Sequence, residues 1–204
     1  MSFHNDYEVQ LLFPVSIFRT NIGTLGEEQY KFVKEKSYTE RTTGTHGRDQ
    51  TDVLEMEIFS DLKQKILSAV QFYSSEIYKH KTTVYLTHSW INHNPSGSYH
   101  NMHTHSNSIF SGVYYINHPS DTPNLNLYNP KRSFPLEILP SESNEVNCNM
   151  WELPVGCGDL VIFPSMLPHE VSKNHGNDDR YTLAFNTFIQ GHIGEKGSDN
   201  YLRL

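Results

Sequence analysis

The chain has 204 residues, of which 36% are hydrophobic, and a formal net charge of −7 at pH 7. This length allows one domain with a substantial core, and the acidic balance argues against nonspecific nucleic-acid binding, which depends on Lys and Arg. No apolar run approaches the roughly 18 to 20 residues that cross a bilayer, and the N-terminus lacks a basic segment followed by an apolar one. We therefore expect a cytoplasmic protein without a membrane span.

The first 80 residues predict one strand and two helices. The segment from Met1 to Thr20 predicts a short strand interrupted by Pro14, which favours an edge position because proline donates no ladder hydrogen bond. A short charged helix is predicted for Gly26–Ser37, and the polar segment Glu40–Asp52 predicts a loop. A second helix follows, because apolar residues recur there at steps of three and four. They are Ile58, Leu62, Ile66, Ala69, Tyr73 and Ile77.

From residue 81 to residue 190, short apolar segments alternate with Pro, Gly, Asn and Asp. This pattern is typical of an all-β sandwich or barrel. The expected strands are Thr82–Asn92, Phe110–Asn117, Asn124–Tyr128, Leu136–Leu139, Asn147–Glu152, Asp159–Phe163 and Arg180–Ile189. We interpret the whole chain as one domain, in which residues 1–80 support a barrel core at 81–190 and residues 191–204 form a tail.

Twelve histidines are many for a chain of this size, and three of them fall within the six residues from His100 to His105. His103 and His105 are separated by one residue, so in an extended segment both side chains lie on one face and could bind one metal ion. His169 follows a compact apolar strand and is a candidate third ligand. His100 could substitute, although its three-residue spacing from His103 suits a helix better.

The predicted strand "RYTLAFNTFI" carries an unusual polar face, formed by Arg180, Thr182, Ala184 and Asn186. An arginine inside a barrel is explained if it binds a carboxylate through charge-assisted hydrogen bonds, because an unpaired buried cation costs several kcal/mol. Asn186 on the same face is expected to border the bound acid. Asn92 shares a face with Trp90 in an earlier strand, and we expect it there as well, although it could be an ordinary polar residue at a strand end.

These motifs resemble the 2-oxoglutarate- and Fe(II)-dependent oxygenases, whose pattern is His-x-Asp/Glu, a distant His, and an Arg or Lys about ten residues later. The matching elements are "HTH" at His103 and His105, His169, and "RYT" at Arg180 and Thr182. "SGVYYIN" resembles a strand of prolyl hydroxylases in which a tyrosine supports the far carboxylate of the cosubstrate. On this resemblance Tyr115 takes that role.

The combination of "HTHSNSIFSGVYYI", "GDLVIFPSMLPHEV" and "RYTLAFN" resembles oxygenases of marine bacteria and their phages, over Ser89 to Ile189. The resemblance implies a double-stranded β-helix, or jelly-roll barrel, buttressed by the N-terminal helices. It also implies Fe(II) and 2-oxoglutarate as cofactors and O₂ as cosubstrate. For a phage-encoded chain the location would be the host cytoplasm.

The chain departs from the family pattern at His105, where a carboxylate is usual. We expect a three-histidine metal site of His103, His105 and His169 in place of two histidines and a carboxylate. Two alternatives stay open: His105 could orient His103 without binding the metal, or water could take the third position.

The implied reaction is oxidation of 2-oxoglutarate to succinate and CO₂, coupled to hydroxylation of a substrate C–H bond. The prolyl-hydroxylase-like strand hints at a protein or peptide substrate, a fold-level analogy that transfers poorly to function. Two rival classes stay open. One is a non-catalytic protein, either a cupin-like module that binds a metal or small acid or a structural phage-type protein that uses the barrel as a scaffold; the other is a three-histidine dioxygenase that does not use 2-oxoglutarate. The sequence predicts neither the substrate's identity nor the oligomeric state.

Overall fold

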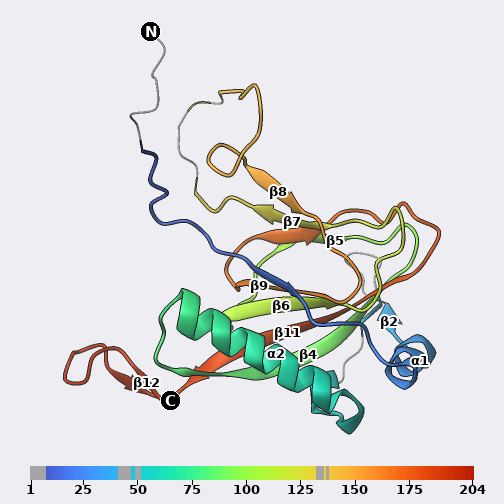
Figure 1. The fold of residues 1–204 in the computed structure, drawn as a ribbon, viewed down its shortest axis with the longest axis horizontal. Coiled ribbons are helices and arrows are strands. Elements are labelled where there is room, and N and C mark those ends of the chain that lie inside the picture. Colours follow the sequence, from blue (N-terminus) through green and yellow to red (C-terminus); the bar gives the residue numbers. More distant parts are fainter. Residues whose placement is uncertain (1–7, 41–46, 49–51, 132–135, 137) are drawn as a thin grey trace.

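A computed structural model describes residues 8–40, 47–48, 52–131, 136 and 138–204 (Figure 1). Its helices are α1 (Glu27–Glu35), α2 (Ser60–Phe72), the short 3₁₀ turns η1 (Val53–Glu55) and η2 (Glu57–Phe59), and a π-helical turn η3 (Tyr73–Ile77). Its strands are β1 (Phe18–Asn21), β2 (Thr39–Glu40), β3 (Gly47–Arg48), β4 (Thr83–Asn94), β5 (His100–His103), β6 (Phe110–Tyr115), β7 (Leu125–Tyr128), β8 (Met150–Leu153), β9 (Asp159–Pro164), β10 (His169–Val171), β11 (Arg180–Gln190), β12 (His192–Ile193) and β13 (Leu202–Arg203).

Two antiparallel sheets form the body of the protein. The larger has the order β1-β9-β6-β11-β4-β3-β2, and the smaller has the order β5-β10-β7-β8. From β4 to β11 successive strands alternate between the two sheets, except that β7 and β8 pair with each other in the smaller one. This connectivity is a double-stranded β-helix, or jelly roll, as the sequence predicted. β12 and β13 form a separate hairpin near the C-terminus (Figure 1).

Period-2 alternation gives the larger sheet two apolar faces. In β9, Leu160 and Ile162 belong to a core shared with α2, whereas Val161 and Phe163 belong to a second core between the sheets. Because adjacent strand residues point in opposite directions, β6 and β9 contribute to both cores. Three members of the second core, Tyr115, Leu125 and Phe163, also line a pocket.

α2 packs against the outer face of the larger sheet (Figure 1). The predicted apolar stripe is buried at Leu62, Ile66, Ala69 and Tyr73, and its two end members, Ile58 and Ile77, are exposed. The α-helix itself ends at Phe72, where the π-helical turn begins. No helix among the described residues has the length and apolar character that a membrane span requires.

Three expectations about secondary structure were wrong. In the described part of the predicted N-terminal strand, pairing begins only at Phe18, beyond Pro14, although β1 is an edge strand as expected. The predicted loop Glu40–Asp52 contains β3, whose backbone pairs with β4, and part of β2. A strand of two residues is too short to show side-chain alternation, so the sequence does not predict it.

No strand is present at the described positions of the predicted strand Leu136–Leu139; position 137 lies outside the described residues. Leu136, Ile138 and Leu139 are between 68% and 83% exposed. The apolar residues alone predicted a strand there, but a strand also needs a neighbouring edge with which to pair.

Candidate active site

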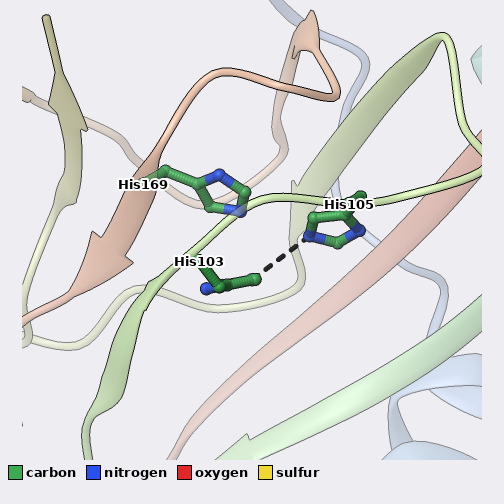
Figure 2. Close-up of side chains that lie close together, drawn as sticks. All are labelled: His103, His105 and His169. Atoms are coloured by element: carbon green, nitrogen blue, oxygen red, sulfur yellow. Dashed lines mark hydrogen bonds between the residues drawn. The ribbon is translucent and has the colours of Figure 1, made fainter. Parts of the chain in front are cut away.

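The three predicted histidines lie together at one end of the smaller sheet (Figure 2). His103 ends β5 and His169 begins β10, and the two residues are direct cross-strand partners. His105 follows β5, and its backbone N–H donates to the carbonyl of Ser165 at 2.9 Å. Hydrogen bonding of the backbone therefore brings together residues that are more than 60 positions apart in the sequence.

The candidate ligand atoms of the three rings all lie within 4.8 Å of one another. The Nε2 atoms of His103 and His105 are 3.2 Å apart. Two neighbouring ligands of an octahedral ion with metal–nitrogen bonds of about 2.1 Å are about 3 Å apart, so this spacing fits two ligands of one ion. Imidazole suits iron among other transition metals.

The Nδ1 atoms face hydrogen-bond acceptors. Nδ1 of His103 lies 2.8 Å from the carbonyl of Asn101, and Nδ1 of His169 lies 2.9 Å from the carbonyl of Leu167. A carbonyl only accepts, so in both rings Nδ1 carries the proton and Nε2 keeps its lone pair. Nδ1 of His105 lies 2.7 Å from Oδ1 of Asn186.

Burial keeps two of these rings neutral. It lowers the pKa of His169 to about 3, with a smaller contribution from His103 in the same direction, while the hydrogen bond to Leu167 opposes the shift. Burial also lowers the pKa of His103. Neutral imidazole is the form that binds metal, so these two rings are ready for coordination at neutral pH.

Aromatic neighbours fix the planes of the rings. Trp90 stacks on His105 with ring centroids 5.9 Å apart, and Phe163 meets His169 edge-on at 4.6 Å. His100, the considered substitute ligand, stacks on His103 at 4.1 Å. It is not among the three residues that meet as a ligand set.

Arg180 lies in the same pocket as the histidines and is only 2% exposed. Its Nη atoms donate to the carbonyl of Pro123 at 3.1 Å and to Oδ1 of Asn94 at 3.4 Å, both of which are neutral acceptors. Its Nε has no hydrogen-bond partner in the described part of the chain. The guanidinium is thus a buried cation with a spare donor, which a carboxylate ligand would satisfy.

Tyr115 supplies a second spare donor next to Arg180. Its ring centroid is 5.8 Å from Cζ of Arg180, and its buried hydroxyl interacts with that guanidinium but makes no hydrogen bond of ordinary geometry among the described residues. Burial, the largest effect, raises the pKa of Tyr115 to about 12, so the hydroxyl keeps its proton at neutral pH. The neighbouring Tyr114 faces the other core, where it donates to the carbonyl of Gly23.

The pocket has about 530 Å³ of empty space, including its open mouth. Thr182 and Asn92 both line it, and the Asn92 amide lies 3.5 Å from the Thr182 hydroxyl. Oδ1 of Asn92 accepts the indole N–H of Trp90 at 3.1 Å. Asn186 does not line the pocket; its side chain contacts His105 instead.

Sequence reasoning assigned no role to Asn94 or Ser111, both of which line the pocket. Asn94 could have been found, because it continues the face of Trp90 and Asn92 by period 2. Ser111 gave no signal, since a serine in an apolar strand is an ordinary residue. The chemistry of the pocket fits the predicted cofactors. The histidine nitrogens suit a metal ion, and Nε of Arg180 and the hydroxyl of Tyr115, which have no hydrogen-bond partner among the described residues, suit a carboxylate.

Residues 88–186 match the protein family described as "Putative 2OG-Fe(II) oxygenase". Among curated proteins there is no match. The fold resembles that of HygX from Streptomyces hygroscopicus, solved with nickel, 2-oxoglutarate and hygromycin B, at a TM-score of 0.61 and 11% identity, covering 85% of this chain and 82% of that one. The fold also resembles those of two prolyl hydroxylases.

The enzyme from Pseudomonas putida has a TM-score of 0.57 and 13% identity, covering 86% of this chain and 92% of its own. The enzyme from Trichoplax adhaerens, in complex with a hypoxia-inducible factor peptide, has a TM-score of 0.60 and 16% identity over 84% and 83%.

One pocket of this jelly roll contains both the histidine cluster and the buried arginine. The family match assigns residues 88–186 to the 2-oxoglutarate- and Fe(II)-dependent oxygenases, which are oxidoreductases that use iron and 2-oxoglutarate.

Proposed function

We propose that His103, His105 and His169 bind Fe(II) through Nε2, and that the chain hydroxylates a substrate C–H bond with release of succinate and CO₂. The observation that carries this proposal is the meeting of three ligand nitrogens within 4.8 Å in a pocket that also contains a buried arginine. In this view His105 is a ligand in place of the usual carboxylate, and the site has one negative charge fewer.

Arg180, Tyr115 and Thr182 are the proposed partners of the far carboxylate of 2-oxoglutarate. Nε of Arg180 and the hydroxyl of Tyr115 are the free donors, and Thr182 adds a hydroxyl on the same wall. Asn92 holds the Trp90 indole and is proposed to border the cosubstrate. Arg180 would orient the acid so that its 2-oxo end faces the histidines.

When bound, iron would activate O₂, whose four-electron reduction would take two electrons from 2-oxoglutarate and two from the substrate C–H bond, so that one oxygen atom enters succinate and the other the hydroxylated product. The chain's own contribution is to position these groups and to exclude water. Val113, Leu125 and Phe163 give the pocket apolar walls, which strengthen the charge-assisted contacts inside it.

For the substrate we propose a prolyl residue within a peptide. The support is the fold shared with two prolyl hydroxylases, one of them solved with a bound peptide. Incubation with proline-containing peptides, Fe(II), 2-oxoglutarate and O₂ should yield a product heavier by one oxygen atom, identified by mass spectrometry.

The test of the reaction class is succinate release. Wild-type protein should release succinate only when Fe(II) and 2-oxoglutarate are both supplied, and His103→Ala, His105→Ala and His169→Ala should each abolish this release. Release by wild-type protein that does not depend on iron would contradict the proposal. So would a His105→Ala variant with full activity, which would remove His105 from the ligand set.

A further inference from the structure

Asn186 occupies an unexpected position. It lies on the same face of β11 as Arg180 and Thr182, yet its carboxamide does not face the pocket. Oδ1 lies 2.7 Å from Nδ1 of His105 and 2.8 Å from the hydroxyl of Ser111. The side chain is thus on the far side of the His105 ring from the candidate metal position.

His105 differs from the other two histidines in what faces its Nδ1. His103 and His169 face backbone carbonyls, which accept only and so fix the tautomer regardless of any side chain. His105 faces a carboxamide, which can present either an accepting oxygen or a donating nitrogen. The tautomer of His105 therefore depends on one side chain.

The two orientations of the Asn186 amide have opposite consequences for metal binding. With the oxygen toward His105, as in this structure, Nδ1 carries the proton and the Nε2 lone pair lies on the side of His103, whose Nε2 is 3.2 Å away. With the nitrogen toward His105, Nδ1 would accept, Nε2 would carry the proton, and the ring would offer nothing to a cation. Stacking on Trp90 fixes the ring plane but cannot distinguish these states, because either tautomer fits the same plane.

Ser111 supports the productive orientation. Its hydroxyl donates to Oδ1 of Asn186, so with the oxygen toward His105 both neighbours donate to the same atom. Ser111 is 1% exposed, and its Oγ is also 2.8 Å from Oγ of Ser165, which holds it in place. Partners of this kind, which contact a ligand and not the metal, commonly change metal affinity 10- to 100-fold.

We propose that Asn186, supported by Ser111, is a positioning residue that selects the Nδ1-protonated tautomer of His105 and so makes this histidine a metal ligand. The inference rests on the proposed function, because it assumes that iron binds where the three rings meet. It explains how an imidazole can stand where the family pattern has a carboxylate. Asn186 prepares the ring as backbone carbonyls prepare the other two.

The test compares two substitutions at Asn186 by the affinity for Fe(II) and Zn(II), measured by competition with a chelator under anaerobic conditions without 2-oxoglutarate. Asn186→Leu keeps the approximate size but removes the acceptor, and should weaken binding by about 10- to 100-fold. Asn186→Asp can only accept, and should bind within a few-fold of wild type. Ser111→Ala should weaken binding less than Asn186→Leu does.

A second readout reports the tautomer directly. In the Zn(II)-loaded protein, ¹⁵N NMR of the histidine rings should show the His105 proton on Nδ1 in the wild type and in Asn186→Asp. Asn126→Leu is the matched control, because Asn126 is also a buried strand asparagine but bonds to Glu170 and Ser172. It should leave metal affinity and the His105 signals unchanged.

Equal metal affinity in Asn186→Leu and wild type would overturn the inference, as would an Asn186→Asp variant as weak as Asn186→Leu. If Asn186→Leu does not fold, Asn186→Asp and Ser111→Ala still decide the outcome by their affinities and NMR signals. His103→Ala distinguishes a wrong metal site from a wrong role for Asn186. If it too binds metal like the wild type, the proposed metal site is wrong; if it loses metal while Asn186→Leu does not, only the role of Asn186 is wrong.

Discussion

Replacement of Arg180 by Met tests the carboxylate site with little change in side-chain length. Arg180 is 2% exposed, and its Nε is the donor that has no hydrogen-bond partner among the residues that the structure describes. Arg180→Met therefore removes the proposed contact to 2-oxoglutarate while leaving the three histidines in place. We expect weaker binding of 2-oxoglutarate and unchanged binding of Fe(II).

The expected loss of 2-oxoglutarate affinity follows from one donor, Nε of Arg180. A hydrogen bond between charged groups contributes about 1.5–3 kcal/mol, so the loss of this contact should weaken 2-oxoglutarate binding by roughly 10- to 150-fold. Stability should change much less. The variant loses two bonds to neutral acceptors, worth about 1 kcal/mol each, but it also removes a buried cation that lacks a counter-ion.

The assay is anaerobic titration of the Fe(II)-loaded protein with 2-oxoglutarate, followed by the visible charge-transfer band of the chelate, together with urea unfolding. Arg19→Met is the control, because Arg19 pairs with Asp159 at 2.7 Å and does not line the pocket. It should lower stability without changing 2-oxoglutarate affinity. Wild-type affinity in Arg180→Met would refute the proposed role of the arginine.

Three further predictions follow from individual side chains. Tyr115→Phe removes the second free donor and should weaken 2-oxoglutarate binding about fivefold, in the same titration, without lowering the melting temperature. His169 has a pKa of about 3 in the fold against 6.5 unfolded, so the unfolded chain binds more protons between these values and the metal-free protein loses stability as pH falls below about 6.5. Urea unfolding should show a loss of about 2 kcal/mol between pH 7 and pH 5, and His169→Asn should reduce that dependence. Gly112→Ala places a Cβ 2.2 Å from Cζ of Phe185 and should cost about 1–3 kcal/mol in denaturant unfolding, part of which Phe185→Leu should restore.

Much of the fold was predictable because side-chain periods report burial. The three-to-four-residue stripe around Ile66 predicted α2, and alternation in β11 predicted that Arg180 and Thr182 share a face, as their common pocket shows. The family pattern predicted a jelly roll. Backbone pairing without a side-chain signature, as in β3, was not predictable. The apolar residues Leu136, Ile138 and Leu139 misled, because at these described positions the chain forms no strand.

In the site, too, the sequence predicted which residues are candidates but not every contact between them. Spacing and motif order identified candidate ligands, and the structure brings His103, His105 and His169 together. The position of Asn186 was predicted only as far as its strand face. Whether its carboxamide meets a cosubstrate or a histidine depends on the contact between His105 and Asn186, a tertiary contact that no sequence period predicts.

The central claim is that one cation is bound by the three histidines in a pocket that also binds 2-oxoglutarate. Anaerobic titration of the wild-type protein with Fe(II), in the presence and absence of 2-oxoglutarate, tests it most directly. We predict one iron per chain and a visible charge-transfer band that requires both components and is absent in His169→Ala. A wild-type protein that shows no band, or a His169→Ala variant that keeps it, would contradict the claim.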